Sequence, residues 1–386
     1  MLNFTLTPEQ GVRREEQRAW LREILPAGWR GSGSSLSDVD WAFARHYNRS
    51  LAAKGWMAPG WPLEHGGMGL DAVSELLFSE EFSYHYVPVG NRFQGVQHIG
   101  PLILHYGTEA QRRQYLPPIT NGEVTWGQGY SEPGSGSDLA SLQTSAVHDG
   151  DDYVINGSKI WSSNAHLAEW MFVLVRTDPD SPKHRGISLV LVPLDAPGVT
   201  IRPLANIAGD ADFNQVFFDN VRVPSTALLG EENRGWYMGV ELLDAERASG
   251  GDTGGLKRQL DDAGPFLPAG SSGAVMRHRY AGLQIELAAA RWLGLRAAWA
   301  SDNGQDYSNA SSATKLMSSE LGQKISAFCA SLLGPAGMLR ESDPRAAGDG
   351  LAAKRYVWSI MDTIGGGTSE IQRTIIATRG LRLPRA

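Results

Sequence analysis

The chain has 386 residues, with 35 Lys and Arg against 42 Asp and Glu, so its formal net charge is −7. Hydrophobic residues make up 42% and charged residues 20%, which is typical of a soluble protein with two or three domains. The sequence has no basic run and no Lys/Arg-rich helix, which argues against nucleic acid and anionic membrane surfaces as partners.

A single cysteine, Cys329, excludes an intramolecular disulfide and a cysteine-based metal cluster. It lies in a small apolar segment, where we expect a buried packing thiol. The first residues lack a cationic stretch followed by an apolar one, and no run approaches about 18 apolar residues. We therefore expect no signal peptide, no membrane span and a cytoplasmic location.

The first block, residues 1–122, is predicted to be helical. Thr7 is a good N-cap, Pro8 suits the first helical position, and Gln10 completes a capping box. Amphipathic patterns follow at residues 13–25, 38–54, 71–84 and 91–106, and a short helix at 109–116 is expected to stop at Pro117 and Pro118.

The second block, residues 123–234, is predicted to be a small β-barrel or sandwich. Short runs of β-branched and aromatic residues are separated by turn clusters, and this regular spacing is typical of such domains. The predicted strands are residues 153–155, 171–176, 187–192, 199–203 and 216–218.

The third block, residues 235–386, returns to helices. Residues 280–302 and 309–333 are long, Ala-rich and favourable for helix formation, and a Gly/Pro/Ser-rich loop is expected at 261–273. The chain is therefore predicted to be an α+β protein with domains at 1–122, 123–234 and 235–386.

Residues 240–255 place one acid, Glu246, on an otherwise small and apolar segment. If the segment is one helix, then Gly250, Thr253 and Gly254 share a face with Glu246. This pattern fits a carboxylate at the edge of a cavity. It fits equally well a solvated Glu on a helix that packs through glycines.

Several enzyme classes lack their motifs in this chain. There is no phosphate-binding P-loop, no Rossmann glycine fingerprint and no H-E-x-x-H or similar metal-ligand spacing among the nine histidines. Ser131 is followed by Glu-Pro and is therefore not in a nucleophile elbow. Hydrolase and metalloenzyme functions are disfavoured, and no metal ligands are expected.

Three motifs together resemble the acyl-CoA dehydrogenase family of flavoproteins: WGQGYSEPGSGSD at residues 126–138, YVINGSKIWSSN at 153–164 and GGGTSEIQR at 365–373. Weaker matches at 55–69 and 218–230 extend the resemblance over nearly the whole chain. It implies an N-terminal helical domain, a middle β-barrel domain and a C-terminal four-helix bundle. It also implies FAD as the cofactor.

The resemblance assigns contacts to the flavin. Tyr130 and Ser131 are expected at its pyrimidine edge, Ser137 at the pyrophosphate or the thioester, Trp161 over the ring and Ser163 near N5. The resemblance also implies two further sets of contacts: Gly136, Thr368 and Glu370 with the cofactor, and Ser137, Asp244, Arg247, Gly250 and Gly367 with the substrate.

The implied reaction is dehydrogenation of an acyl-CoA thioester to the trans-2-enoyl-CoA, for which a carboxylate removes the α-proton. Many family members carry this base as Glu directly before the C-terminal Gly-Thr, where this chain has Gly366. A minority place it as Glu before Arg on the first helix of the C-terminal domain, which matches Glu246-Arg247. Glu246 is therefore the predicted base, and Glu370 is a poor substitute.

A second departure concerns the half of the cofactor site that a neighbouring subunit completes. The family's Arg-x-x-Phe-Gly segment is missing from residues 261–280, where Arg277 or Arg279 is an alternative, and Gln-x-x-Gly-Gly is replaced by SLLGP at 331–335. Such departures resemble actinobacterial acyl-CoA dehydrogenases of sterol degradation. They imply a bulky, branched or polycyclic acyl group and a homotetramer or α2β2 heterotetramer, with an electron-transfer flavoprotein as acceptor.

Two other functions remain open on the same fold. The chain could be a non-catalytic subunit that completes the FAD site of a heteromeric partner, although a silent subunit does not need Glu246. It could also be a flavin monooxygenase, which does not need the base. The sequence does not distinguish CoA from a carrier protein as the acyl carrier.

Overall fold

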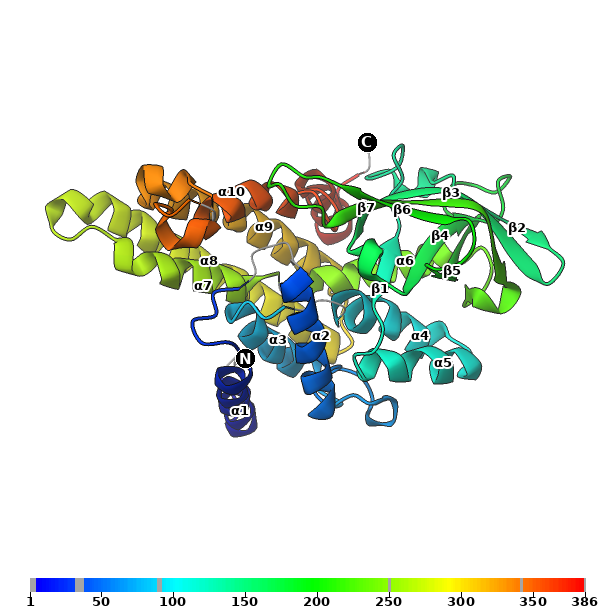
Figure 1. Cartoon of the computed structure of the whole chain (residues 1–386), viewed down its shortest axis with the longest axis horizontal. Coiled ribbons are helices and arrows are strands. Elements are labelled where there is room, and N and C mark those ends of the chain that lie inside the picture. The colour runs from blue at the N-terminus through cyan, green and yellow to red at the C-terminus, as the bar shows by residue number, and fades with distance from the viewer. Residues whose placement is uncertain (1–4, 32–37, 89–91, 249–250, 341–342, 385–386) are drawn as a thin grey trace. The chain divides into compact units, whose positions relative to one another are not determined.

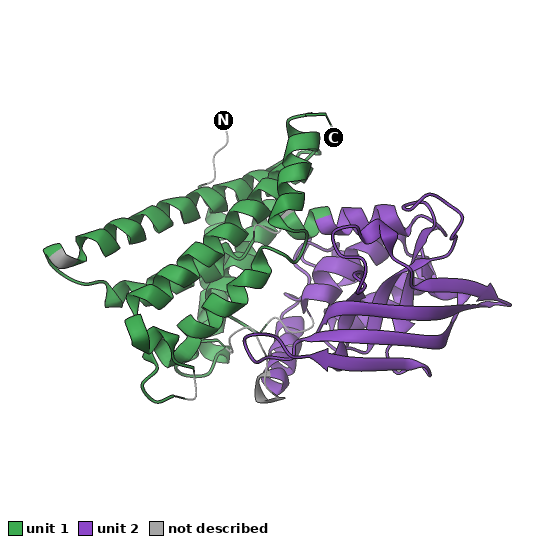
Figure 2. Cartoon of the chain, turned by 90° about the horizontal axis from the view of Figure 1, so that it is seen from above, with its two compact units in different colours: residues 1–36, 70–88, 244–386 green, residues 37–69, 89–243 purple. Residues whose placement is uncertain are grey.

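The computed structural model of the chain describes residues 5–31, 38–88, 92–248, 251–340 and 343–384. The chain divides into two compact units (Figure 2). We call residues 1–36, 70–88 and 244–386 the helical unit, and residues 37–69 and 89–243 the sheet unit. The N-terminal helices therefore contribute to both units.

The helical unit is built from the elements that Figure 1 labels α1, α3 and α7 onward. The predicted capping box of α1 is confirmed, because Thr7 accepts from the Gln10 N–H and the Gln10 side chain accepts from the Thr7 N–H. The helices are α1 (Pro8–Ile24), α3 (Ala72–Tyr84), α7 (Thr253–Ala263), α8 (Ala274–Asp302), α9 (Ser308–Leu332), α10 (Leu351–Asp362) and α11 (Ser369–Ile375).

Leucines of α7, α8 and α9 form the apolar core of the C-terminal helices. Leu260, Leu287 and Leu321 are buried in one cluster, with α10 packed along α9. Cys329 belongs to this cluster, and burial raises the pKa of its thiol to about 11. The predicted buried packing thiol is confirmed.

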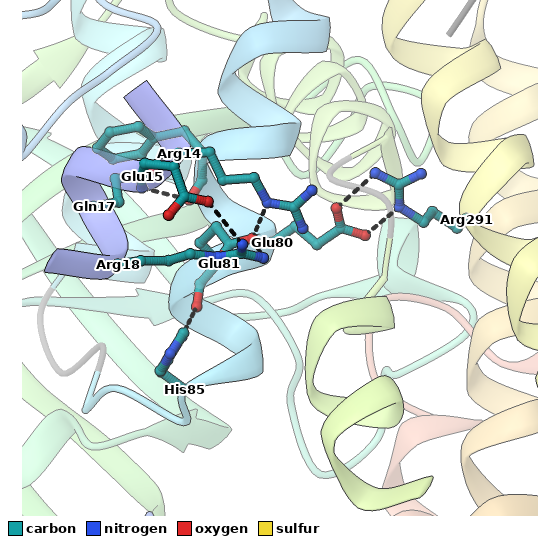
Figure 3. A network of polar contacts seen from close by, with 9 residues as sticks. Arg14, Glu15, Gln17, Arg18, Glu80, Glu81, His85 and Arg291 are labelled. Carbon is teal, nitrogen blue, oxygen red and sulfur yellow. Dashed lines mark hydrogen bonds and ion pairs between the residues drawn. The ribbon is translucent and has the colours of Figure 1, made fainter. Parts of the chain in front are cut away.

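A charged network connects α1, α3 and α8 inside the helical unit (Figure 3). Glu81 of α3 is buried and accepts hydrogen bonds from Arg14 and Arg18 of α1. The neighbouring Glu80 accepts two bonds from Arg291 of α8, at 2.5 and 2.9 Å. Burial by itself would raise the pKa of Glu81, but the bonds and charges of Arg18 and Arg14 outweigh it and lower that pKa.

The sheet unit contains one eight-stranded mixed sheet, with its ladder in the order β6-β7-β3-β2-β4-β5-β8 and with β1 paired to β4. Its strands are β1 (Trp126–Gly129), β2 (Ser145–Asp149), β3 (Asp152–Ser163), β4 (Trp170–Arg176), β5 (Ile187–Pro193), β6 (Val199–Leu204), β7 (Phe213–Pro224) and β8 (Leu228–Leu229). Its helices are α2 (Asp38–Ala53), the π-helix η2 (Phe93–Ile99), α4 (Gly100–Tyr106), α5 (Glu109–Thr120) and the start of α6 (Gly235–Ala248).

Two halves of this sheet enclose a common apolar core. The two halves meet between β2 and β4 at one parallel pair, Ser145 and Arg176. Alternate residues of β3 and β7 in one half and of β4 and β5 in the other are buried together, including Ile155, Val173, Val190 and Val216. The α+β fold predicted for the chain is therefore confirmed.

Two helical boundaries differ from the sequence prediction. Helix α5 continues through Pro117 and Pro118 to Thr120, because prolines in a last turn remove few helical bonds. Helix α8 begins at Ala274, six residues before the predicted start. Within the described residues, no helix is both long and apolar enough to cross a membrane.

A buried ion pair ties the segment after β1 to β3. The Lys159 ammonium is fully buried and donates to Glu132 Oε1 at 2.7 Å and to the Tyr130 carbonyl at 3.1 Å. The Glu132 carboxylate also accepts the N–H groups of Gln143 and Thr144, at 2.6 and 2.8 Å. Burial lowers the pKa of Lys159 to about 8, against the opposing effect of Glu132.

Replacing Glu81 by Gln is expected to lower the free energy of unfolding by about 2 kcal/mol at pH 7, because the charge-assisted bonds to Arg14 and Arg18 are lost. Since the pKa of Glu81 is lowered by folding, its stabilisation is present above the ordinary carboxyl pKa and disappears as the pH falls through the folded value. The gap between wild type and variant, measured by denaturant unfolding, should shrink at pH 3. Glu15→Gln, which removes an exposed pair with Arg18, is the control and should cost less than about 1 kcal/mol.

Lys159→Met is expected to cost about 3 kcal/mol, because it leaves the Glu132 carboxylate buried without its cation. Lys159 has a pKa of about 8 in the folded protein and its ordinary, higher pKa in the unfolded chain. Between these two pH values the unfolded chain binds more protons, so the free energy of unfolding of the wild type rises with pH there. The variant should lack that rise. In the control Lys183→Met, which removes an exposed pair with Asp138, we expect a loss under about 1 kcal/mol; equal losses in both variants would contradict the prediction.

Candidate functional site

The predicted base lies in the last turn of α6. Glu246 is half-buried there, beside Asp244 and the buried Arg247. Arg247 donates to Asp244 Oδ1 at 2.8 Å, and Asp244 also pairs with Arg379 at 3.3 Å. Burial lowers the pKa of Arg247.

The prediction that one helical face joins Glu246 to Gly250, Thr253 and Gly254 is wrong. Helix α6 ends at Ala248, Gly251 has a left-handed φ of +60°, and Asp252 caps α7 by accepting from the Gly255 N–H. Glycine at the exit and an acidic N-cap favour two helices over one. Gly250 lies outside the described residues.

The small residues of α7 have a packing role instead. A Cβ placed on Gly254 would lie 2.4 Å from the Glu80 carbonyl oxygen and 2.9 Å from the Tyr84 nitrogen, so glycine permits α7 to approach α3 this closely. The neighbouring Thr253 is also buried. These residues therefore give no support to a large acyl cavity beside Glu246.

Glu246 faces the glycine loop, which we define as residues 363–368 between α10 and α11. A Cβ placed on Gly366 would lie 3.3 Å from Glu246 Oε1. Gly366 and Gly367 have φ values of +66° and +97°, which disfavour any side chain. The acid of α6 therefore reaches the place where a side chain at residue 366 would begin.

Three side chains donate hydrogen bonds to carbonyl oxygens of this loop. Arg247 Nε donates to Gly366 O at 3.1 Å, and Gln372 Nε2 donates to Gly366 O and Gly367 O, both at 3.1 Å. Lys315 Nζ donates to Gly367 O at 2.8 Å and to Asp362 O at 3.0 Å. Neither Lys315 nor Gln372 was predicted from the sequence, because a lone lysine within the stretch ASSATKLMSS and a single glutamine carry no periodic signal.

Thr368 and Glu370, predicted to contact the cofactor, begin α11. Thr368 is its N-cap and accepts from the Ile371 N–H, while Glu370 is exposed. Bonds from its own backbone N–H and from Thr368 lower the pKa of Glu370. Both residues line an open cavity of about 450 Å³ together with Glu320, Gln323, Lys324, Thr363, Ile364 and Ser369. The predicted substrate residue Gly367 lies directly before Thr368.

In the sheet unit, Ser131 lies beside the part of β3 that contains Trp161. The Ile160 N–H donates to the Ser131 carbonyl at 2.8 Å, and Trp161 is the next residue along β3, two positions before Ser163. The ring of Tyr130 is buried edge-on against Phe172, at a centroid distance of 5.8 Å. Its main chain, not its ring, is therefore the part that we expect near a flavin.

Trp161 combines two unfavourable features. Its φ is +63°, in the left-handed region, at a register shift between Lys159 and Ser162, and its side chain is 58% exposed. An exposed indole held at a strained bulge fits a site for a flat aromatic ligand. The flavin contacts expected of Trp161, Ser131 and Ser163 stay predictions.

Gly136 and Ser137 follow a tight turn, which Glu132 and Ser135 close with two reciprocal backbone bonds of 3.0 Å. Both residues are exposed, and a Cβ on Gly136 would meet nothing within 4 Å. The segment is therefore accessible to a ligand such as a pyrophosphate.

The two arginines considered in place of the missing family segment differ in their surroundings. Arg277 donates to the carbonyls of Pro268 and Gly270 at 2.5 and 2.7 Å, so it braces its own loop. Arg279 is exposed on α8. Both arginines are exposed, and they differ in that the guanidinium of Arg277 is bonded to its own loop.

Comparisons with known proteins match this arrangement over the whole chain. Residues 8–123, 127–221 and 233–381 match the N-terminal, middle and C-terminal domains of acyl-CoA dehydrogenase. Acyl-CoA dehydrogenase IpdE1 of Mycobacterium tuberculosis is 38% identical, with 96% of this chain and 97% of the relative covered. Among solved structures, the Tcur3481-Tcur3483 steroid ACAD has a TM-score of 0.90 at 32% identity, with both chains fully covered.

The ChsE4-ChsE5 complex from Mycobacterium tuberculosis is similarly close, with a TM-score of 0.88, 32% identity and full coverage of both chains. The expected cofactor, FAD, is the one that this family of flavoprotein oxidoreductases uses. At this identity and coverage, family membership rests on the sequence match as well as on the fold. This chain belongs to the acyl-CoA dehydrogenase family.

Proposed function

We propose that the chain catalyses FAD-dependent α,β-dehydrogenation of an acyl-CoA thioester to the trans-2-enoyl-CoA, with Glu246 as the base. The observation that carries the proposal is the 3.3 Å between Glu246 Oε1 and the Cβ position of Gly366. In family members whose catalytic acid is at this loop position, the side chain of that acid would begin at this Cβ position. In this chain α6 supplies a carboxylate at the same place.

In this mechanism Glu246 removes the α-proton with one carboxylate oxygen. Arg247 pairs with Asp244 and with the Gly366 carbonyl, so its bonds orient the turn that carries Glu246. The residues proposed to hold the cofactor are Tyr130 through its main chain, Ser131, Gly136, Ser137, Trp161, Ser163, Thr368 and Glu370. When bound, FAD supplies the acceptor for the β-hydrogen, which leaves as hydride.

A bulky polycyclic acyl group, such as a steroid side chain or ring fragment, is the substrate class that we propose. The support comes from the relatives, since the solved Tcur3481-Tcur3483 protein is described as a steroid ACAD. Gly250, Thr253 and Gly254 do not support this class, because Gly254 packs against α3, Thr253 is buried, and Gly250 lies outside the described residues. Electron-transfer flavoprotein remains the proposed acceptor.

We also propose an α2β2 heterotetramer with a related subunit. Two observations support it: Arg277 is engaged by its own loop, and one of the most similar solved structures is a complex of two different subunits. The partner subunit would supply the cofactor contacts that residues 261–280 lack. A homotetramer is the alternative.

Anaerobic addition of a steroid acyl-CoA to the flavin-loaded enzyme is expected to bleach the flavin absorbance. Glu246→Gln should keep its flavin but lose bleaching by at least about 10³-fold, because the proton acceptor is gone. Glu241→Gln, which changes an exposed acid of the same helix, should bleach as the wild type does. Undiminished bleaching in Glu246→Gln would refute the assignment. Equal rates with straight-chain thioesters would refute the substrate class.

Expressed alone, the chain is expected to purify with less than one FAD per subunit. Co-expression with a family subunit that retains Arg-x-x-Phe-Gly should raise the flavin content and give a mass of four chains. Absorbance spectra and light scattering measure both quantities. A homotetramer with one FAD per chain would contradict the heteromeric assembly, and it would leave the role of Glu246 untouched.

A further inference from the structure

Lys315 of α9 has an unusual pair of hydrogen-bond partners. Its ammonium is half-buried and donates to two backbone carbonyls, Asp362 O at 3.0 Å and Gly367 O at 2.8 Å. These carbonyls stand at the two ends of the glycine loop, since Asp362 ends α10 and Gly367 precedes the N-cap of α11. One side chain therefore spans the loop.

The same lysine lies beside the middle of the loop. A Cβ on Gly366 would lie 3.9 Å from Lys315 Cε and 3.3 Å from Glu246 Oε1. The lysine stem and the carboxylate therefore both lie on the side of Gly366 that a side chain would occupy. A loop that moved away from Lys315 in that direction would also move away from Glu246.

We propose that Lys315 is a positioning residue for the reaction: by bonding both ends of the glycine loop, it fixes Gly366 against the Glu246 carboxylate. The inference rests on the proposed role of Glu246 as the base. A fixed loop restricts the rotamers of Glu246 and so directs its oxygen toward the α-hydrogen. Proton abstraction depends steeply on such geometry, and a misplacement of about 1 Å can cost about 10²-fold in rate.

Packing alone does not account for a lysine at this position. Burial lowers the pKa of Lys315, which means that folding disfavours its charged form. An apolar side chain would fill the space without that cost, but it would leave the carbonyls of Asp362 and Gly367 without this donor. The charged groups that act on Lys315 are Asp362, Arg247, Glu246 and Glu320.

The test compares Lys315→Met with Lys257→Met in the flavin-loaded enzyme. Lys257 is exposed on α7 and pairs with Asp261, so it serves as the matched control. Hydrogen exchange is followed at Ile364 and Gly365 of the loop, whose N–H groups bond to Met361 O of α10, and at Ser369, the first residue of α11, whose N–H bonds to Thr363 O of the loop. In Lys315→Met these amides should exchange at least tenfold faster, kcat should fall about 10²-fold, and KM should stay within twofold.

Unchanged exchange at these amides, or an unchanged kcat, in Lys315→Met would overturn the inference. If that variant does not fold, Lys315→Gln takes its place, since an amide keeps N–H donors without the charge; exchange should then be about threefold faster and kcat about tenfold lower. The exchange measurement needs neither turnover nor substrate. If Glu246 is not the base, the Glu246→Gln variant will be active. If Lys315 does not position the loop, the loop amides of Lys315→Met will stay protected from exchange.

Discussion

The proposed active site depends on one steric constraint: the space beside residue 366 that the Glu246 carboxylate occupies accommodates only one acidic side chain. With φ at +66°, Gly366 is in a conformation that a residue with a Cβ adopts at a cost of about 1 kcal/mol or more. A glutamate there would also place its Cβ 3.3 Å from Glu246 Oε1, and its own carboxylate would repel the resident one. The glycine is therefore a condition for the acid on α6, and the two residues form one structural unit.

That constraint explains why the loop needs support from outside itself. Three consecutive glycines have high conformational freedom in the unfolded chain, and they contribute no side chains that would fix the loop. The order comes from Arg247, Lys315 and Gln372, whose donors take up the carbonyl oxygens of Gly366 and Gly367. Two of these three donors are cations, and bonds from charged donors are stronger than neutral ones.

In the sheet unit, the Lys159–Glu132 ion pair fixes a loop in a comparable way. Lys159 holds the Tyr130 carbonyl and the Glu132 carboxylate to β3, and it lies two residues before the strained Trp161. A strained residue persists where its surroundings over-determine it, and a buried charged pair with three donors on one carboxylate provides such surroundings. In both units a lysine that is at least half-buried bonds backbone carbonyls near a residue with positive φ.

The sequence was informative wherever a motif fixed a local geometry, and it failed where packing chose between local signals. The capping box at Thr7 and strands such as those at 171–176 and 187–192, short runs of mostly β-branched and other apolar residues, were readable because they depend on neighbours in the chain. The roles of Lys159 and Lys315 were not readable, since a lone lysine has no periodic signal and its partners are distant carbonyls. Periodicity also suggested a face of small residues on the helix that carries Glu246. In the structure Gly251 and Asp252 separate that helix from α7, and Gly254 of α7 permits the close contact with α3. Glycine next to a functional acid is thus ambiguous between room for a ligand and room for a helix. The neighbours of a hypothetical Cβ distinguish the two cases here. At Gly254 the Cβ would meet backbone atoms of α3, whereas at Gly366 it would meet the Glu246 carboxylate.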